Sequence, residues 1–138
     1  MNRIIVIYIV ALWLPVSCMV DKTYNLEATI VLVNDTGHNI TISPNTKYGW
    51  WYPDCFTITA NNCWSVTKTI NNYEPIVIFS EVEIIIDDRT QISLNANDDK
   101  SIYNPCVSEN YVRQDTEKNV TFTFTFTEEV IDYIESVI

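Results

Sequence analysis

Apolar and polar residues alternate with period two along much of this chain. The clearest case is residues 120–127, Val-Thr-Phe-Thr-Phe-Thr-Phe-Thr, where Phe122, Phe124 and Phe126 recur on one face. Because successive side chains of a β-strand point to opposite faces of the sheet, this pattern predicts a strand with buried phenylalanines and solvated threonines. A transmembrane β-barrel strand alternates in the same way, but no second stretch of this chain alternates as cleanly.

Residues 27–43 carry the second strong pattern. An apolar run over 29–33 is followed by Asn-Asp-Thr-Gly and then by a run in which Ile40 and Ile42 share one face. β-Branched residues on both sides of a Gly-containing turn predict a β-hairpin. The first strand is apolar on both faces, so we expect it to be central in its sheet.

Shorter runs of the same kind follow, separated by turns about 8–12 residues apart. They cover residues 56–60, 64–67, 76–86 and 91–94, and the third is either one long strand or two short strands broken near Ser80. Residues 130–138 suit a short helix and a final strand equally well. The fold class predicted is all-β: a single antiparallel β-sandwich of about eight short strands.

The first 18 residues have the pattern of a secretory signal peptide. Arg3 precedes an apolar core over residues 4–14, and Val-Ser-Cys ends the segment at Cys18. The apolar run is shorter than the roughly 20 residues that a spanning helix needs. We therefore expect a signal peptide over 1–18, a β-sandwich domain over 19–138 and an extracellular protein. The alternatives are an uncleaved anchor, a buried strand, or a lipoprotein signal with Cys18 lipidated, for which Pro15 is unusual.

The charge balance narrows the class of partner. The chain has 8 Lys and Arg against 18 Asp and Glu, a net charge of −10. Such an acidic chain repels phosphate backbones, so no nucleic acid is expected as a partner. A purely electrostatic hold on anionic lipid is disfavoured for the same reason. No motif indicates a cofactor.

Three cysteines follow the signal segment, and a secreted chain usually pairs its cysteines. The disulfide candidates are Cys55, Cys63 and Cys106, and one of the three must stay unpaired. The sequence does not choose among the three pairings. Their spacing lacks any C-x2-C unit, so no metal site is predicted.

Three Asn-x-Thr sequons lie at Asn34, Asn39 and Asn119. In a secreted eukaryotic chain they predict N-linked glycans on exposed backbone, although an Asn- and Thr-rich chain also produces such triplets by coincidence. The first two lie at or beside the predicted hairpin turn.

Catalytic motifs are lacking, and the chain is not expected to be an enzyme. His38 is its single histidine, lies in a predicted turn and has no nucleophile motif near it. The acidic pairs at 87–88 and 98–99 are read as solvated turn residues and do not form an EF-hand loop.

An aromatic stretch is the strongest candidate for a binding site. Residues 48–52 read Tyr-Gly-Trp-Trp-Tyr, in a predicted loop. Exposed Trp and Tyr rings stack on sugars or lie at the headgroup level of a membrane. The alternative is that these rings cover one end of the sandwich. The binding residues predicted are Tyr48, Trp50, Trp51, Tyr52 and, from the resemblance described next, Tyr111.

The order of these motifs resembles the aegerolysin-like cytolysins and related small crystal toxins. The resemblance rests on the 33–37 turn, Gly49-Trp50, Pro53 before Phe-Thr-Ile, Trp64, and residues 104–111, Asn-Pro-Cys-Val-Ser-Glu-Asn-Tyr. Ser108 stands where that family would have Gly, and the signal, the sequons and the absence of a Gly-rich middle segment are also departures. The resemblance implies a small β-sandwich that recognises membrane lipid, with Trp50, Trp51 and Tyr111 as contacts.

The sequence thus predicts a secreted protein that binds a membrane lipid or a cell-surface glycan, in the manner of a cytolysin. The alternative is a secreted interaction factor whose partner is a protein.

Overall fold

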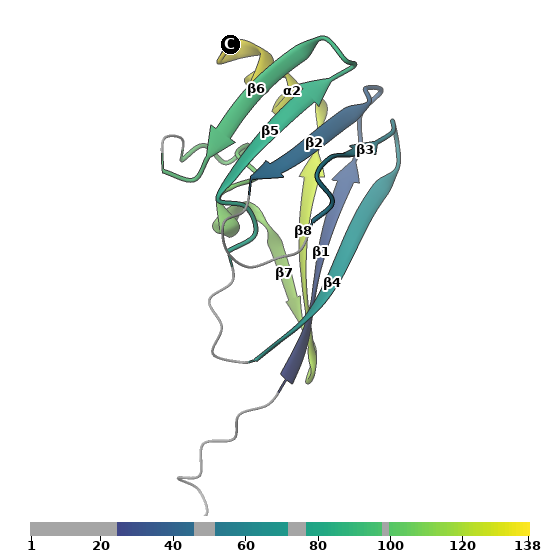
Figure 1. The fold of residues 1–138 in the computed structure, drawn as a ribbon, viewed down its shortest axis with the longest axis vertical. Helices are drawn as coiled ribbons and strands as arrows, with labels where there is room; N and C mark the ends of the chain where they lie inside the picture. Colours follow the sequence, from purple (N-terminus) through teal and green to yellow (C-terminus); the bar gives the residue numbers. More distant parts are fainter. Residues whose placement is uncertain (1–24, 46–51, 72–76, 98–99) are drawn as a thin grey trace, which may run out of the picture.

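A computed structural model describes residues 25–45, 52–71, 77–97 and 100–138. Within these residues eight strands form two four-stranded sheets, and one short helix follows them (Figure 1). Sheet A has the strand order β4–β1–β8–β7, and sheet B has the order β3–β2–β5–β6. The β-sandwich predicted from the sequence is confirmed. The elements are β1 (Asn25–Asn34), β2 (Ile40–Asn45), β3 (Phe56–Ile58), β4 (Cys63–Asn71), β5 (Glu81–Ile86), β6 (Thr90–Asn95), the 3-10 helix η1 (Ser108–Asn110), β7 (Val112–Asp115), β8 (Asn119–Phe126) and α2 (Glu128–Ser136).

The core lies between the sheets and is built from the inward face of each strand. On β8, Phe122, Phe124 and Phe126 are all 5% exposed or less, so the predicted burial of this phenylalanine face is confirmed. The Phe124 ring meets Phe126 edge to face, with centroids 5.0 Å apart. Ile30 and Leu32 of the neighbouring β1 are fully buried.

The hairpin predicted over residues 27–43 is wrong. β1 pairs with β4 and β8 in sheet A, whereas β2 pairs with β3 and β5 in sheet B. The link over residues 35–39 therefore carries the chain from one sheet to the other. The sequence pattern predicted a turn after the first strand and the central position of that strand in its sheet. It did not indicate which strands pair.

The sandwich is also not wholly antiparallel. β1 and β8 run parallel, from Glu27 opposite Asn119 to Asn34 opposite Phe126, and every other strand pair in the described residues is antiparallel. The apolar stretch over 76–86 was expected to form one long strand or two short ones, but its described part holds a single six-residue strand, β5, which begins after Ser80. Ile78 and Phe79 are buried before the strand begins, and β5 starts at Glu81.

The C-terminal segment forms the helix α2 and not a final strand. Thr127 is its N-cap, and its Oγ1 accepts a hydrogen bond from the N–H of Val130 at 3.4 Å. The first turn carries Glu128 and Glu129, which suit the positive end of the helix dipole. Val130, Ile131 and Ile134 are buried at helical spacing, so one face of the helix covers the core.

Candidate functional site

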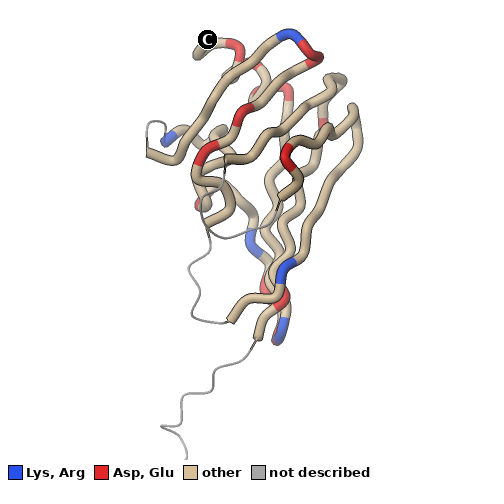
Figure 2. Tube along the Cα trace, in the orientation of Figure 1, with Lys and Arg blue, Asp and Glu red and all other residues tan. Residues whose placement is uncertain are grey.

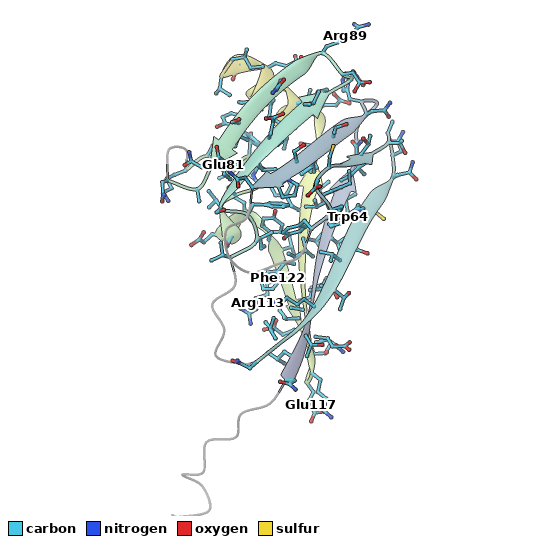
Figure 3. The ribbon with its side chains drawn as sticks, viewed as in Figure 1. Trp64, Glu81, Arg89, Arg113, Glu117 and Phe122 are labelled. Carbon is cyan, nitrogen blue, oxygen red and sulfur yellow. The ribbon has the colours of Figure 1, made fainter. Side chains whose placement is uncertain are left out.

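Four aromatic rings gather where the edge strands β3 and β4 come together. Phe56 of β3 and Trp64 of β4 are half-buried and stack with centroids 4.0 Å apart and planes inclined by 16°. Figure 3 labels Trp64 on its strand. Tyr52 lies behind them, with its ring 6.0 Å from Trp64 and 4.9 Å from Phe79. We call Tyr52, Phe56, Trp64 and Phe79 the aromatic seam, because they close the opening between the two sheet edges.

Tyr52 is the only one of the five aromatic-stretch positions that lies in the described part of the chain. It is 9% exposed, and its hydroxyl donates a hydrogen bond to the carbonyl of Ile78 at 2.9 Å. Burial raises the pKa of the phenol above its ordinary value. Tyr52 is therefore a core anchor and not the exposed contact that was predicted. Tyr48, Trp50 and Trp51 lie outside the described residues.

Tyr111, the contact implied by the family resemblance, is also part of the core. It is 6% exposed, its hydroxyl donates to the carbonyl of Pro105 at 2.7 Å, and its ring lies 5.3 Å from that of Phe124. Burial raises the pKa of this phenol well above its ordinary value. In this structure its ring is not open to a ligand.

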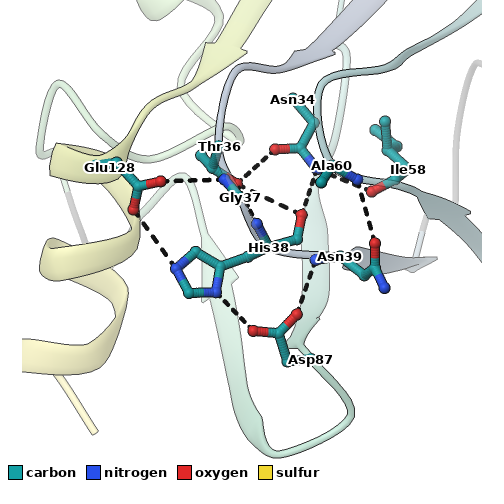
Figure 4. A network of polar contacts seen from close by, with 9 residues as sticks. All are labelled: Asn34, Thr36, Gly37, His38, Asn39, Ile58, Ala60, Asp87 and Glu128. Atoms are coloured by element: carbon teal, nitrogen blue, oxygen red, sulfur yellow. Dashed lines mark hydrogen bonds and ion pairs between the residues drawn. The ribbon is translucent and has the colours of Figure 1, made fainter.

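A polar junction joins three segments at one end of the sandwich (Figure 4). His38 lies in the β1–β2 link, and its Nδ1 is 2.6 Å from Oδ2 of Asp87 in the β5–β6 turn. Its Nε2 is 3.5 Å from Oε2 of Glu128, the first residue of α2. Glu128 Oε1 accepts a hydrogen bond from the N–H of Gly37 at 3.2 Å, and Asp87 Oδ1 accepts one from the N–H of Asn39 at 2.8 Å.

His38 and Asp87 in this junction shift each other's pKa values toward the charged form. The hydrogen bond to Asp87 raises the pKa of the His38 imidazole, and the nearby carboxylates of Glu128 and Glu135 add to the effect. The hydrogen bond from His38, followed by that from the N–H of Asn39, lowers the pKa of Asp87. The two ring nitrogens of His38 lie against the carboxylates of Asp87 and Glu128, and this geometry suits a link between segments better than a nucleophilic site.

Asn34, predicted as a glycan site, is instead enclosed. Its side chain is 1% exposed, and its Nδ2 donates toward the carbonyls of His38, Ile58 and Thr59 at 2.7, 2.9 and 3.2 Å. Its Oδ1 accepts from the hydroxyl of Thr36 at 2.7 Å. This folded structure leaves no room for a glycan on Asn34. Asn39 and Asn119 are exposed.

Among the described residues no disulfide forms, although the sequence predicted one. Cys55 and Cys63 are exposed free thiols, and Cys106 is buried. Burial, with the negative charge of Glu81 nearby, raises the pKa of Cys106 to about 12. Its Sγ lies 3.3 Å from the carbonyl of Leu94, which further encloses it.

The sequence predicted only part of the candidate site. Phe56 and Trp64 were correctly placed in alternating strands, but nothing in the sequence indicated that their rings stack. Asp87 was read as a solvated turn residue, and no local pattern linked it to His38, 49 positions away.

Two kinds of site are absent from the part of the chain that the structure describes. The described residues hold no group of three His, Cys, Asp or Glu side chains placed to bind a metal ion. No helix among them has the length and apolar content to cross a bilayer.

Comparison with known proteins gives no relative. No family model, no curated protein and no solved structure matches this chain.

Proposed function

We propose that this is a secreted β-sandwich protein that acts by binding, not by catalysis, and that it recognises a membrane lipid or a cell-surface glycan beside the aromatic seam. The observation that carries the proposal is the half-buried stack of Phe56 on Trp64, whose partly exposed rings lie next to the buried Tyr52. Tyr48, Trp50 and Trp51 directly precede that anchor in the sequence. The sequence predicts a loop for these residues, and loops are common places for binding residues.

The chemistry of the seam favours an uncharged or zwitterionic ligand. Aromatic faces stack on the C–H groups of sugar rings and lie well at the boundary between lipid headgroups and acyl chains. With a net charge of −10, the chain repels strongly anionic surfaces. The resemblance to aegerolysin-like cytolysins points the same way, and membership of that family remains part of the proposal.

A protein partner is the second candidate. The exposed side of α2 carries Glu129, Asp132 and Glu135, and Asp87 and Asp88 lie exposed in the β5–β6 turn. Figure 2 shows acidic residues recurring at this end of the molecule, with Arg89 among them. A basic protein surface would complement this charge.

Vesicle and glycan-array binding by full-length secreted protein tests the proposal. The wild type is compared with Trp50→Ala and Trp51→Ala, and with Tyr103→Ala as the matched control. Tyr103 is a half-buried aromatic residue that packs on Tyr133 of α2, and it is not a seam residue.

We expect the two Trp variants to lose at least tenfold in affinity and the control to retain it. Binding to neither ligand class, or Trp variants that match the wild type, would overturn the proposal. Capture of one stoichiometric protein from serum or cell surfaces, with no lipid or glycan binding, would favour the second candidate.

A further inference from the structure

Strand β8 begins with an exposed asparagine whose side chain makes no hydrogen bond within the described residues. This residue is Asn119, and Thr121 completes its sequon. The carbonyl of Asn119 accepts a hydrogen bond from the N–H of Thr116 at 2.8 Å, and its backbone pairs with Glu27 of β1. Figure 3 labels Glu117, two residues earlier, at the lower end of sheet A. The backbone of Asn119 is thus held firmly while its amide stays accessible to modification.

A hollow of about 390 Å³ opens beside Asn119. Register places Asn119, Glu27 and Thr69 in one row across β8, β1 and β4 on the outer side of sheet A. The hollow is lined by these three residues and by Asn25, Leu26 and Lys118. Amide, hydroxyl, carboxylate and ammonium groups supply both donors and acceptors, which sugar hydroxyls and an acetamido group require. The hollow therefore offers one sugar ring polar partners next to the point of attachment.

Above the hollow, the outer face of sheet A has no charged side chain. We call this surface the uncharged face; its residues are Thr29, Val31, Val33, Cys63, Ser65, Thr67, Val112, Gln114, Thr121, Thr123 and Thr125. Among the described strand residues that point outward from sheet A, only Glu27, in the row of the hollow, is charged. The outer face of sheet B carries Glu81 and Glu83 along β5. Sheet A thus lacks charge on one face in a chain whose net charge is −10.

The side chains of the uncharged face suit a neutral, hydroxyl-rich covering. Thr and Ser present hydroxyls for hydrogen bonds and methyl or methylene groups for the C–H faces of sugar rings. Residues two positions apart on a strand lie about 6.8 Å apart, so sugars beyond the first reach Thr121 and Thr29 in the next row. Each such contact is weak. A glycan tethered at Asn119 nevertheless remains at a high effective concentration over the face, so weak contacts suffice to keep it there.

We propose that an N-linked glycan on Asn119 is a structural part of this domain, with its first sugar in the hollow and the following sugars over the uncharged face. Attachment forms a bond from Nδ2 of Asn119 to C1 of an N-acetylglucosamine and releases one amide proton. The bond that breaks joins C1 to the diphosphate of a lipid-linked oligosaccharide, and the lipid diphosphate leaves. The inference rests on the proposed secretion of the protein, because the donor and its transferase belong to the secretory route.

Thermal unfolding of the full chain, secreted from cells that attach high-mannose N-glycans, tests the role of this glycan. The wild type is compared with Asn119→Gln and, as the matched control, with Asn39→Gln, since Asn39 is the other exposed sequon residue. We expect loss of the Asn119 glycan to lower the melting temperature by about 3 °C or more and loss of the Asn39 glycan to leave it unchanged. Hydrogen exchange over residues 25–29 and 67–69 should speed up in Asn119→Gln alone.

The sugar and the side chain are separated by two further comparisons. In protein made without glycosylation, Asn119→Gln should melt with the wild type. Should Asn119→Gln not fold when secreted, Thr121→Val removes the sequon and keeps Asn119, whereas Thr121→Ser keeps the sequon. Trimming by an endoglycosidase to one N-acetylglucosamine should preserve most of the stabilisation, because the first sugar occupies the hollow.

Three outcomes would overturn the proposal. The first is a folded, secreted protein with a glycan at Asn39 and none at Asn119, which would leave the proposed secretion intact. The second is a glycan at Asn119 whose loss changes neither the melting temperature nor the hydrogen exchange. The third is a chain that is not exported and carries no glycan at either residue, which would overturn the proposed secretion as well.

Discussion

Nδ1 of His38 lies 2.6 Å from Oδ2 of Asp87, and this one contact ties the crossing between the two sheets to the β5–β6 turn. Glu128 adds the start of α2 to the same imidazole, with 3.5 Å between its Oε2 and Nε2. The charge of the partly exposed His38 side chain therefore influences how three segments are held together.

The stability of the domain should fall as the pH rises past neutrality. Contact with Asp87 raises the pKa of His38 above its ordinary 6.5, so folding favours the charged imidazole. That contribution is fully present below 6.5 and is lost as the pH rises through the raised value. Urea unfolding at a series of pH values from about 6 to 8 should show a modest decrease in the free energy of unfolding. The slope should flatten in His38→Gln; an unchanged slope in that variant would place the effect elsewhere.

Phe124→Ala should destabilise the domain strongly. The Phe124 ring is 3% exposed and contacts the rings of Tyr111 and Phe126. Truncating a buried Phe costs about 3–5 kcal/mol, which should lower the melting temperature by more than about 10 °C. Thermal unfolding followed by circular dichroism measures the shift, with Thr125→Ala on the outer side of the same strand as control. A shift of only a degree or two for Phe124→Ala would contradict the core assignment.

Asn34→Ala should cost about 2–3 kcal/mol, because it removes the donor to carbonyls of two segments far apart in the sequence. Its Nδ2 contacts the carbonyls of His38 and Ile58, so the side chain holds the β1–β2 link against the end of β3. Asn39→Ala is the control, since Asn39 is exposed and its Oδ1 accepts one hydrogen bond, from Ala60. Equal free energies of unfolding for the two variants would refute the bracing role of Asn34.

Thiol labelling should distinguish the three cysteines. Cys55 and Cys63 are exposed, so both should react rapidly with a thiol reagent in the native protein. Cys106 should react only on unfolding, because it is 3% exposed and burial raises its pKa to about 12. Native protein without any reactive thiol would instead indicate a Cys55–Cys63 disulfide.

Glycan mapping should separate the three sequons. Protein secreted from cells that perform N-glycosylation should carry glycans at Asn39 and Asn119, which are exposed, and none at Asn34, which is 1% exposed. Enzymatic deglycosylation with peptide mass spectrometry identifies the modified residues. A folded, secreted protein with a glycan at Asn34 would show that this side chain is not enclosed as described.

The sequence predicted well those features that depend on local periodicity. The alternation over 120–127 predicted the buried face of β8, and the apolar run over 29–33 predicted a central strand. β7 was missed, because Val112–Asp115 is fully exposed and contains Arg, Gln and Asp, which carry no strand signal.

Features that depend on distant partners could not be predicted. Asn34 in an Asn-Asp-Thr-Gly turn reads as a surface residue, and only the approach of Ile58 makes it a buried one. Tyr52 follows two tryptophans and reads as part of an exposed stretch, until Phe79 is found against its ring. In each case a contact across more than 20 residues reversed the local expectation.

The parallel pairing of β1 with β8 bears on how the chain acquires its fold. Glu27 finds its neighbour Asn119 about ninety residues later in the chain. During synthesis or export, the first strand must therefore wait for nearly the whole polypeptide before the centre of sheet A can close. Sheets that depend on such distant pairings fold slowly, on the order of milliseconds to seconds. Because β8 is the last strand in the chain, the centre of sheet A can form only once synthesis is almost complete.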